Sequence, residues 1–119
     1  MKMSLISIDK GGFVRLSVDG EITCRDLHAG DGHNPLEKVL GESWANNRVL
    51  LSLAKTGFMD SSAIGWLLEC QRKFKAAGGK LVLHSASPRV QDVFDLLKIG
   101  KALNLKENEK TAIELLTAA

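Results

Sequence analysis

The pattern of apolar and polar positions predicts strands in the first half of the chain. Two β-patterns open the sequence, and in the second of them Val14, Leu16 and Val18 alternate with polar residues. A glycine-containing turn joins the two patterns, which predicts a hairpin. A later run is almost continuously apolar, as expected for a strand buried on both faces near the centre of a sheet. These three strands are expected at residues 4–8, 13–18 and 49–53.

Helical signals dominate the second half. The longest helix is expected from Ser61 to Ala77, closed by the glycine pair that follows it. A strand from Lys80 to His84 comes next, so strand, helix and strand form a βαβ unit. The fold class is therefore predicted to be α/β, with a mixed sheet of four to five strands and about four helices packed on it. Three further helices are expected, from Asn34-Pro35 to about Trp44, from Ser87-Pro88 through Leu97, and from about Asn108 to Leu116.

Length, charge and cysteine content narrow the possible functions. The 119 residues are predicted to form one domain spanning 1–119, with no linker or repeat. The net charge is +2 and the basic residues are dispersed, which argues against nucleic acid or an anionic membrane surface as a partner. No apolar run approaches the roughly 20 residues needed to cross a bilayer, so we expect a cytoplasmic protein without membrane insertion. Cys24 and Cys70 are expected to be free thiols.

A helical wheel over residues 61–77 separates a core face from an outer face. The outer face carries Leu68, an apolar residue that a neighbouring element either covers or leaves exposed for binding. Its alignment with Ser61 and Gly65 favours a partner surface, while Ser62 lies toward a flank. The core stripe is predicted to contain Ala63, Trp66, Leu67, Cys70, Phe74 and Ala77, and the outer face Ser61, Gly65, Leu68 and Arg72.

The sequence Asp60-Ser61-Ser62 at the start of this helix has two interpretations. The simpler is a helix N-cap, in which a side-chain oxygen accepts a hydrogen bond from a free backbone amide. The other is a phosphorylation site, because ligand sites of βαβ units lie at the carboxyl ends of the strands, where His84 and Ser85 are also expected. A phosphate on Ser61 would add about −1.5 to −2 charges and would change partner binding much more than folding.

Residues 58–65 resemble the signature of STAS domains, and specifically of bacterial anti-sigma factor antagonists, in which an apolar pair precedes Asp-Ser-Ser or Asp-Ser-Thr. Similar stretches occur in the same order along nearly the whole chain, which implies the STAS fold. They comprise Leu16 to Glu21 for the second strand and its turn, Val49 to Leu53 for the central strand, residues 77–83 for the Gly-Gly return, and residues 87–90 with Phe94-Asp95 for the third helix.

The resemblance implies a role for the first serine after the aspartate, which is Ser61, with Ser62 as second choice. In the family a partner serine kinase, often itself an anti-sigma factor, phosphorylates this serine. The unphosphorylated protein sequesters that partner, and a serine phosphatase resets the switch, so sigma-factor-dependent transcription is controlled without catalysis or a cofactor of its own. The expected partner-binding residues are Thr23, Asp60, Ser61, Ser62, Gly65, Leu68 and Arg72, with His84 and Ser85 near the phosphate.

Two features depart from the family pattern. Ala63 stands where a glycine is usual, and the segment from Cys24 to Asn34 is longer than its family counterpart. In the family an aspartate after the second strand commonly helps to contact the kinase, whereas here Thr23 follows Ile22. These departures leave open a different kind of regulator as partner. Two alternative functions also stay open: a non-phosphorylated STAS subunit of a transporter or lipid-trafficking complex, and a nucleotide-binding STAS domain.

Other chemistries fit the sequence less well. A serine hydrolase would need glycines flanking its nucleophile and a positioned base, and Ser61 lacks those glycines. The glycine patch at 30–32 neither follows a strand nor opens a helix, as a phosphate-binding loop would. A polar loop also explains the possible metal ligands better than zinc does, because their spacing fits no common zinc motif. Those ligands would be Cys24, His28, Asp31 and His33.

Overall fold

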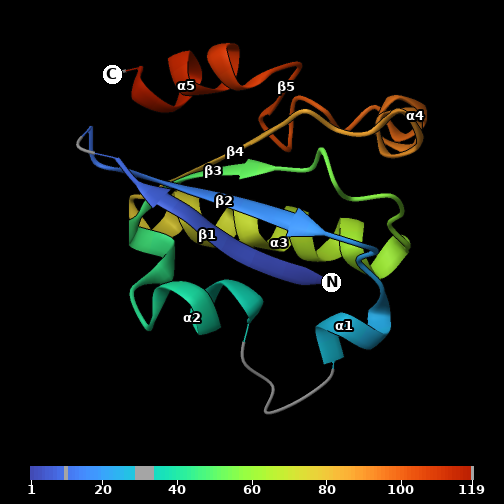
Figure 1. Cartoon of the computed structure of the whole chain (residues 1–119), viewed down its shortest axis with the longest axis horizontal. Coiled ribbons are helices and arrows are strands. Elements are labelled where there is room, and N and C mark those ends of the chain that lie inside the picture. The colour runs from blue at the N-terminus through green and yellow to red at the C-terminus, as the bar shows by residue number, and fades with distance from the viewer. Residues whose placement is uncertain (10, 29–33, 119) are drawn as a thin grey trace.

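The computed structural model describes residues 1–9, 11–28 and 34–118, and it contains one five-stranded mixed sheet. The spatial order of the strands is the same as their order in the chain, from β1 at one edge to β5 at the other (Figure 1). Strands β1 and β2 are antiparallel, and all later neighbours are parallel. The strands are β1 (Lys2–Ile8), β2 (Phe13–Asp19), β3 (Arg48–Ser52), β4 (Lys80–His84) and β5 (Leu105–Lys106).

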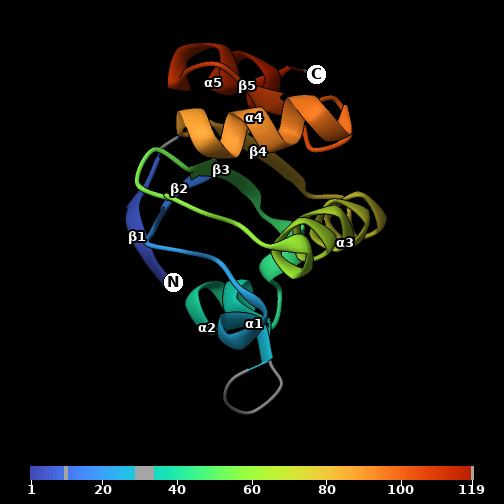
Figure 2. The ribbon, with the colours of Figure 1, turned by 90° about the vertical axis from the view of Figure 1, so that its right-hand side faces the viewer.

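Helices cover both faces of this sheet, with α3 and α5 on opposite sides (Figure 2). The larger core lies on the α3 side, where the alternate residues Val49, Leu51 and Leu53 face the buried side chains of α3. The smaller core joins Leu50 and neighbouring strand residues to α5. The helices are α1 (Cys24–His28), α2 (Pro35–Leu40), α3 (Ser61–Ala77), α4 (Pro88–Leu97) and α5 (Glu109–Thr117), with a 3₁₀ turn η1 (Trp44–Asn46).

The predicted α/β fold is confirmed, including the hairpin, the central strand β3, and the bounds of α3 and β4. The predicted end of α2 at Trp44 was wrong: the helix stops at Leu40 because Gly41 adopts a φ of 86°. Part of the segment expected to be irregular, from Cys24 onward, forms the short helix α1. Strand β5 has only two residues and was too short to be recognised as a separate pattern.

Helix α3 owes its length to strong signals at both ends. The side chain of Asp60 caps its N-terminus, and Gly78 ends it in the left-handed conformation with a φ of 85°. The predicted core stripe is correct for its four fully buried members, Ala63, Leu67, Cys70 and Phe74. Trp66 is partly buried and packs against the main core, and the prediction was wrong only at Ala77, which is exposed at the end of the helix. None of the helices within the described ranges is long and apolar enough to cross a membrane.

Candidate functional site

The loop that leads from β3 into α3 is fixed to the end of β2 and to the segment that follows it. Thr56 is fully buried, and its hydroxyl donates to the carbonyl of Val18 at 2.9 Å. Ile22 and Met59 form an isolated parallel bridge, in which the Ile22 amide donates to the Phe58 carbonyl at 3.0 Å. These contacts give the N-terminus of α3 a defined position next to residues 22–24.

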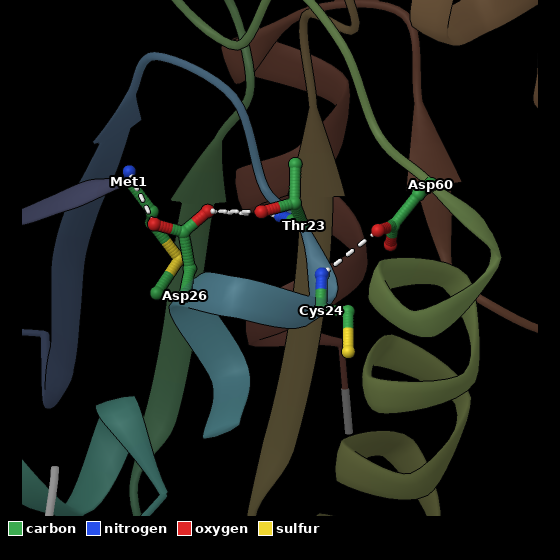
Figure 3. A network of polar contacts seen from close by, with 5 residues as sticks. All are labelled: Met1, Thr23, Cys24, Asp26 and Asp60. Atoms are coloured by element: carbon green, nitrogen blue, oxygen red, sulfur yellow. Dashed lines mark hydrogen bonds and ion pairs between the residues drawn. The ribbon is translucent and has the colours of Figure 1, made fainter. Parts of the chain in front are cut away.

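Asp60 connects the starts of two helices through one carboxylate. Its Oδ1 accepts from the amide of Ala63 at 3.0 Å, which caps α3. Its Oδ2 accepts from the amide of Cys24, the first residue of α1, at 2.8 Å (Figure 3). These two backbone hydrogen bonds hold the pKa of the Asp60 carboxyl below its ordinary value, because they stabilise the charged form. Asp60 is therefore both an N-cap and a tie between α1 and α3.

A second carboxylate, Asp26, stabilises the neighbouring helix start. Its Oδ2 accepts from both the amide and the hydroxyl of Thr23, at 2.9 and 3.0 Å, and its Oδ1 pairs with the α-amino group of Met1 at 3.0 Å (Figure 3). The ammonium contact first, and the Thr23 amide second, lower the pKa of the Asp26 carboxyl. The sequence analysis missed Asp26, although a threonine followed three residues later by an acid is a helix-start signal. Thr23, which the sequence predicted as a partner-binding residue, therefore already forms hydrogen bonds with Asp26.

The two serines differ in accessibility, as the helical wheel predicted. Ser61 is exposed at the first position of α3, and Ser62 is partly buried. Immediately beside Asp60 is a polar pocket of about 600 Å³. Ser61 follows Asp60 in the chain but does not itself line this pocket. The pocket is lined by Met1, Glu21, Thr23, Cys24, Arg25, Asp26 and Asp60.

The outer face of α3 is partly as predicted. Gly65 is exposed, and a methyl group added to it would meet no atom within 4 Å. Arg72 is exposed and pairs with Glu69 one turn before it. Leu68, whose exposure the sequence left open, is partly buried and packs against the main core. Phe58 was not predicted to be at the surface, but its side chain is 40% exposed three residues before Ser61.

His84 and Ser85 lie at the carboxyl end of β4, but the expectation that the imidazole would neighbour Ser61 was wrong. His84 shares its strand face with Val82, which belongs to the α5 side of the sheet, whereas α3 covers the other side. There the His84 side chain lines a pocket together with Arg15 and Glu109. Burial, and secondarily the charge of Arg15, lower the pKa of His84.

Part of the possible metal-ligand set within residues 24–33 lies outside the described residues. Asp31 and His33, together with the glycine patch at 30–32, lie outside them. Within residues 1–9, 11–28 and 34–118, no group of three or more His, Cys, Asp or Glu side chains is arranged to hold a metal ion. Cys24 and Cys70 are free thiols, the first exposed and the second buried, and burial raises the pKa of Cys70 to about 11.

Comparison with known proteins agrees with this architecture. The STAS domain family model matches residues 9–112, which is most of the chain. The chain belongs to the STAS domain family. A STAS domain protein from Planctomyces limnophilus, described as an anti-sigma-factor antagonist, superposes with a TM-score of 0.72 at 16% identity, covering 98% of both chains.

Three further solved structures share this fold. The anti-sigma factor antagonist SpoIIAA superposes in its unphosphorylated form with a TM-score of 0.64 at 23% identity, covering 97% of this chain and 96% of that chain. A Bacillus SpoIIAA in its phosphorylated form gives 0.64 at 20% identity, covering 97% and 99%. A sulfate transporter family protein from Wolinella succinogenes gives 0.59 at 13% identity, covering 93% and 88%. At these identities the likeness is one of fold.

Proposed function

We propose that this STAS domain is an anti-sigma factor antagonist-like module whose binding to a protein partner is controlled by phosphorylation of Ser61. In its unphosphorylated form it binds an anti-sigma factor or serine kinase, phosphorylation releases that partner, and a serine phosphatase restores binding. The domain itself performs no catalytic step. Its effect is on sigma-factor-dependent transcription in a bacterial cytoplasm.

The observation that carries this proposal is the exposure of the Ser61 side chain at a helix start whose geometry other residues maintain. Capping of α3 depends on the Asp60 carboxylate and not on Ser61. A kinase can therefore modify Ser61 without removing the cap. The neighbouring positions on the expected docking face, Gly65 and Arg72, are also exposed.

The electrostatic effect of a phosphate at this position favours release of the partner. It would add about −1.5 to −2 charges to a surface where Asp60 is already ionised, with its pKa lowered. A partner that buries this surface must desolvate the phosphate and tolerate repulsion from Asp60, unless it supplies cations of its own. Burying an unpaired charge costs about 3–5 kcal/mol, which is enough to weaken a complex of moderate affinity by at least about a hundredfold.

The experiment compares tagged wild type with Ser61→Ala and Ser61→Asp in pull-downs from the native cytoplasm, with intact-mass measurement of the captured module. We expect wild type and Ser61→Ala to retain the partner, and Ser61→Asp to retain at least about tenfold less. A single phosphate should be found on wild type and on Ser62→Ala, and should be absent from Ser61→Ala.

Ser43→Asp is the matched control, because Ser43 is exposed at the N-cap of η1 and its side chain makes no capping hydrogen bond. It adds the same charge beside η1, which contacts the C-terminal half of α3 and not the end that carries Ser61, and should bind as wild type does. Equal capture by all variants, with no phosphate on wild type, would refute the switch. If the common partner were then a transport protein, the result would favour the alternative function as a constitutive transporter subunit, which the Wolinella succinogenes structure supports.

A further inference from the structure

A second pocket, of about 620 Å³, lies at the opposite end of α3 from Ser61. It opens between the C-terminal half of α3, the start of β4 and the turn that precedes β5. Ser61 does not line this pocket, although Leu68 and Arg72 of the expected docking face do. Its lining residues are Leu68, Gln71, Arg72, Phe74, Lys75, Gly78, Gly79, Lys80, Leu81, Ala102 and Asn104.

The pocket exists because β5 is too short to cover the edge of β4. Strand β5 pairs only with Leu83 and His84, so the first half of β4 has no strand neighbour on that side. The carbonyl of Leu81 is nevertheless satisfied, because it accepts from the side-chain amides of Gln71 at 2.9 Å and Asn104 at 3.1 Å. An added peptide strand would have to displace both amides, so this edge is unsuited to strand addition.

The remaining surface of the pocket is largely apolar. Leu68 from α3 and Ala102 from the turn contribute apolar side chains at the surface of the pocket, and the fully buried Phe74 and Leu81 lie beneath them. Gly78 has no side chain to fill the opening, and its φ of 85° disfavours one. A volume of this size is within the range of about 300–1,000 Å³ that is usual for sites of small organic ligands.

All ionisable side chains that line the pocket are cationic: Arg72, Lys75 and Lys80. The ammonium group of Lys80 donates a hydrogen bond to the carbonyl of Leu115, and Arg72 forms an ion pair with Glu69, so both cations already have a partner. Lys75 is exposed and has no ion pair among the residues that the structure describes. An anionic group placed at the rim near Lys75 would gain a charge-assisted contact while an attached apolar body fills the pocket.

We propose that this pocket binds a small amphipathic organic anion, with an aromatic or alkyl body and one carboxylate, sulfonate or phosphate group. The apolar walls contact the body, and Lys75 with Arg72 contacts the charged group. Binding is independent of Ser61, since the two sites lie at opposite ends of α3. The module would thus have a ligand site that shares Leu68 and Arg72 with its expected partner-binding face and does not include Ser61.

The test uses 8-anilinonaphthalene-1-sulfonate as an anionic probe and N-phenyl-1-naphthylamine, its neutral analogue, in fluorescence titrations of the folded protein. We expect the sulfonate to bind at one site and more tightly than the neutral analogue. Lys75→Glu should weaken its binding about tenfold, because a contact becomes a repulsion. Lys110→Glu makes the same charge change on exposed α5 and should leave the affinity unchanged.

Two further measurements locate the bound probe. Ala102→Trp should abolish binding by filling the pocket from an exposed turn position that requires no change in the core. In NMR spectra, the sulfonate should shift the backbone amides of Gly79 and Asn104 and leave that of Cys24 unmoved. Melting curves check that each variant is folded, and if Ala102→Trp is not, Lys75→Glu and the amide shifts decide.

Wild-type affinity in Lys75→Glu, or equal affinity for both probes, would overturn the proposal by showing non-specific apolar binding. Probe-induced shifts confined to other regions would overturn it as well. Ser61→Asp should bind the sulfonate as wild type does, so failure of the phosphorylation switch and failure of this ligand site give different results.

Discussion

The two ends of α3 are held in place by different means. At the N-terminus the Asp60 carboxylate forms hydrogen bonds to two backbone amides, and the adjacent Ser61 side chain is free at the surface. At the C-terminus the backbone itself is in close contact with a neighbour: a Cβ on Gly79 would lie 2.1 Å from the carbonyl oxygen of Ala45 and 2.5 Å from that of Asn47.

This difference shows where the helix tolerates chemical change. Polar capping by one side chain leaves the neighbouring surface open, so a charge can be added there without disturbing the packing. Close backbone contact leaves no room even for a methyl group. A regulatory site is therefore compatible with the N-terminal end of α3, while close backbone contact fixes the C-terminal end against η1 and Asn47. Four changes test this comparison.

The largest effect is expected for Phe74→Ala. Phe74 is fully buried in the C-terminal half of α3, and its ring makes an edge-to-face contact with Trp44 at a centroid distance of 5.4 Å. Removing it should lower the free energy of unfolding by about 3–5 kcal/mol in urea titrations. Leu68→Ala, on the partly buried outer face, should cost only about 1–2 kcal/mol. Equal losses would show that the two faces contribute alike.

Gly79→Ala should be the next most damaging change, because its methyl group would collide with two backbone oxygens that cannot rotate away. We expect a loss of about 1–3 kcal/mol in the free energy of unfolding, typical of overpacking. Thermal unfolding followed by circular dichroism measures it. A Gly79→Ala protein as stable as wild type would mean that η1 shifts freely, which contradicts the rigid contact described for this end.

Acid should weaken the N-terminal end selectively. The folded-state pKa of Asp60 lies below the ordinary value of 3.8, so its contribution to stability is complete above that value. The contribution is lost as the pH falls through the lower folded-state pKa. In NMR titrations, the amide of Cys24 should follow this protonation, and the amide of Gly79, which donates to the Phe74 carbonyl at 2.9 Å, should not.

Asp60→Asn is the control for the acid effect, because asparagine is similar in shape and has no titrating proton. Its single carbonyl oxygen can accept from the amide of Ala63 or from that of Cys24 but not from both, so the variant is compared with itself across the pH range and not with wild type at one pH. Wild type should show a titration of the Cys24 amide between pH 5 and pH 2.5, and this titration should be absent from Asp60→Asn. Asp26, whose pKa is lowered as well, shifts wild-type stability in the same direction, so any titration that persists in Asp60→Asn belongs to Asp26. A persistent shift of full size would contradict the assignment to Asp60.

The smallest effect, and one of opposite sign, is expected for Gly65→Ala. Gly65 is exposed within α3 and its added methyl group meets open space, so alanine should raise the free energy of unfolding by about 0.5–1 kcal/mol. Because Gly65 belongs to the proposed docking face, the same variant should weaken partner capture while melting at a higher temperature. Unchanged capture would place the partner elsewhere.

The fold was predictable wherever local signals agreed with tertiary packing. Asp60 before α3 and Gly78 after it are strong caps, and both bounds of that helix were right. Helix α1 was missed because five residues give no periodic pattern, and its start depends on contacts of Thr23 and Cys24 with two aspartates. Strand β5 was missed because two residues carry no alternation.

At the candidate site, the sequence separated Ser61 from Ser62 correctly, because a helix fixes the angle between successive residues. The sequence did not predict which face of the sheet His84 occupies, because a continuous apolar run has no alternation that distinguishes the two faces. Once β4 is paired with β3 in register, His84 lies opposite Ser52, and its face follows from that of Val82. The link between Asp60 and Cys24 joins residues 36 positions apart, and only the folded chain reveals it.

The agreement between strand order in space and strand order in the chain has a consequence for how the protein forms. A chain that emerges from the ribosome adds each strand beside one that is already present, beginning with the β1–β2 hairpin. Each later parallel pairing still requires a long intervening segment to close, which slows the step. Pairing with β3 covers the edge of β2, whereas the apolar face of the hairpin stays uncovered until α2 and α3 pack on it, so aggregation competes most strongly with folding before α3 has emerged.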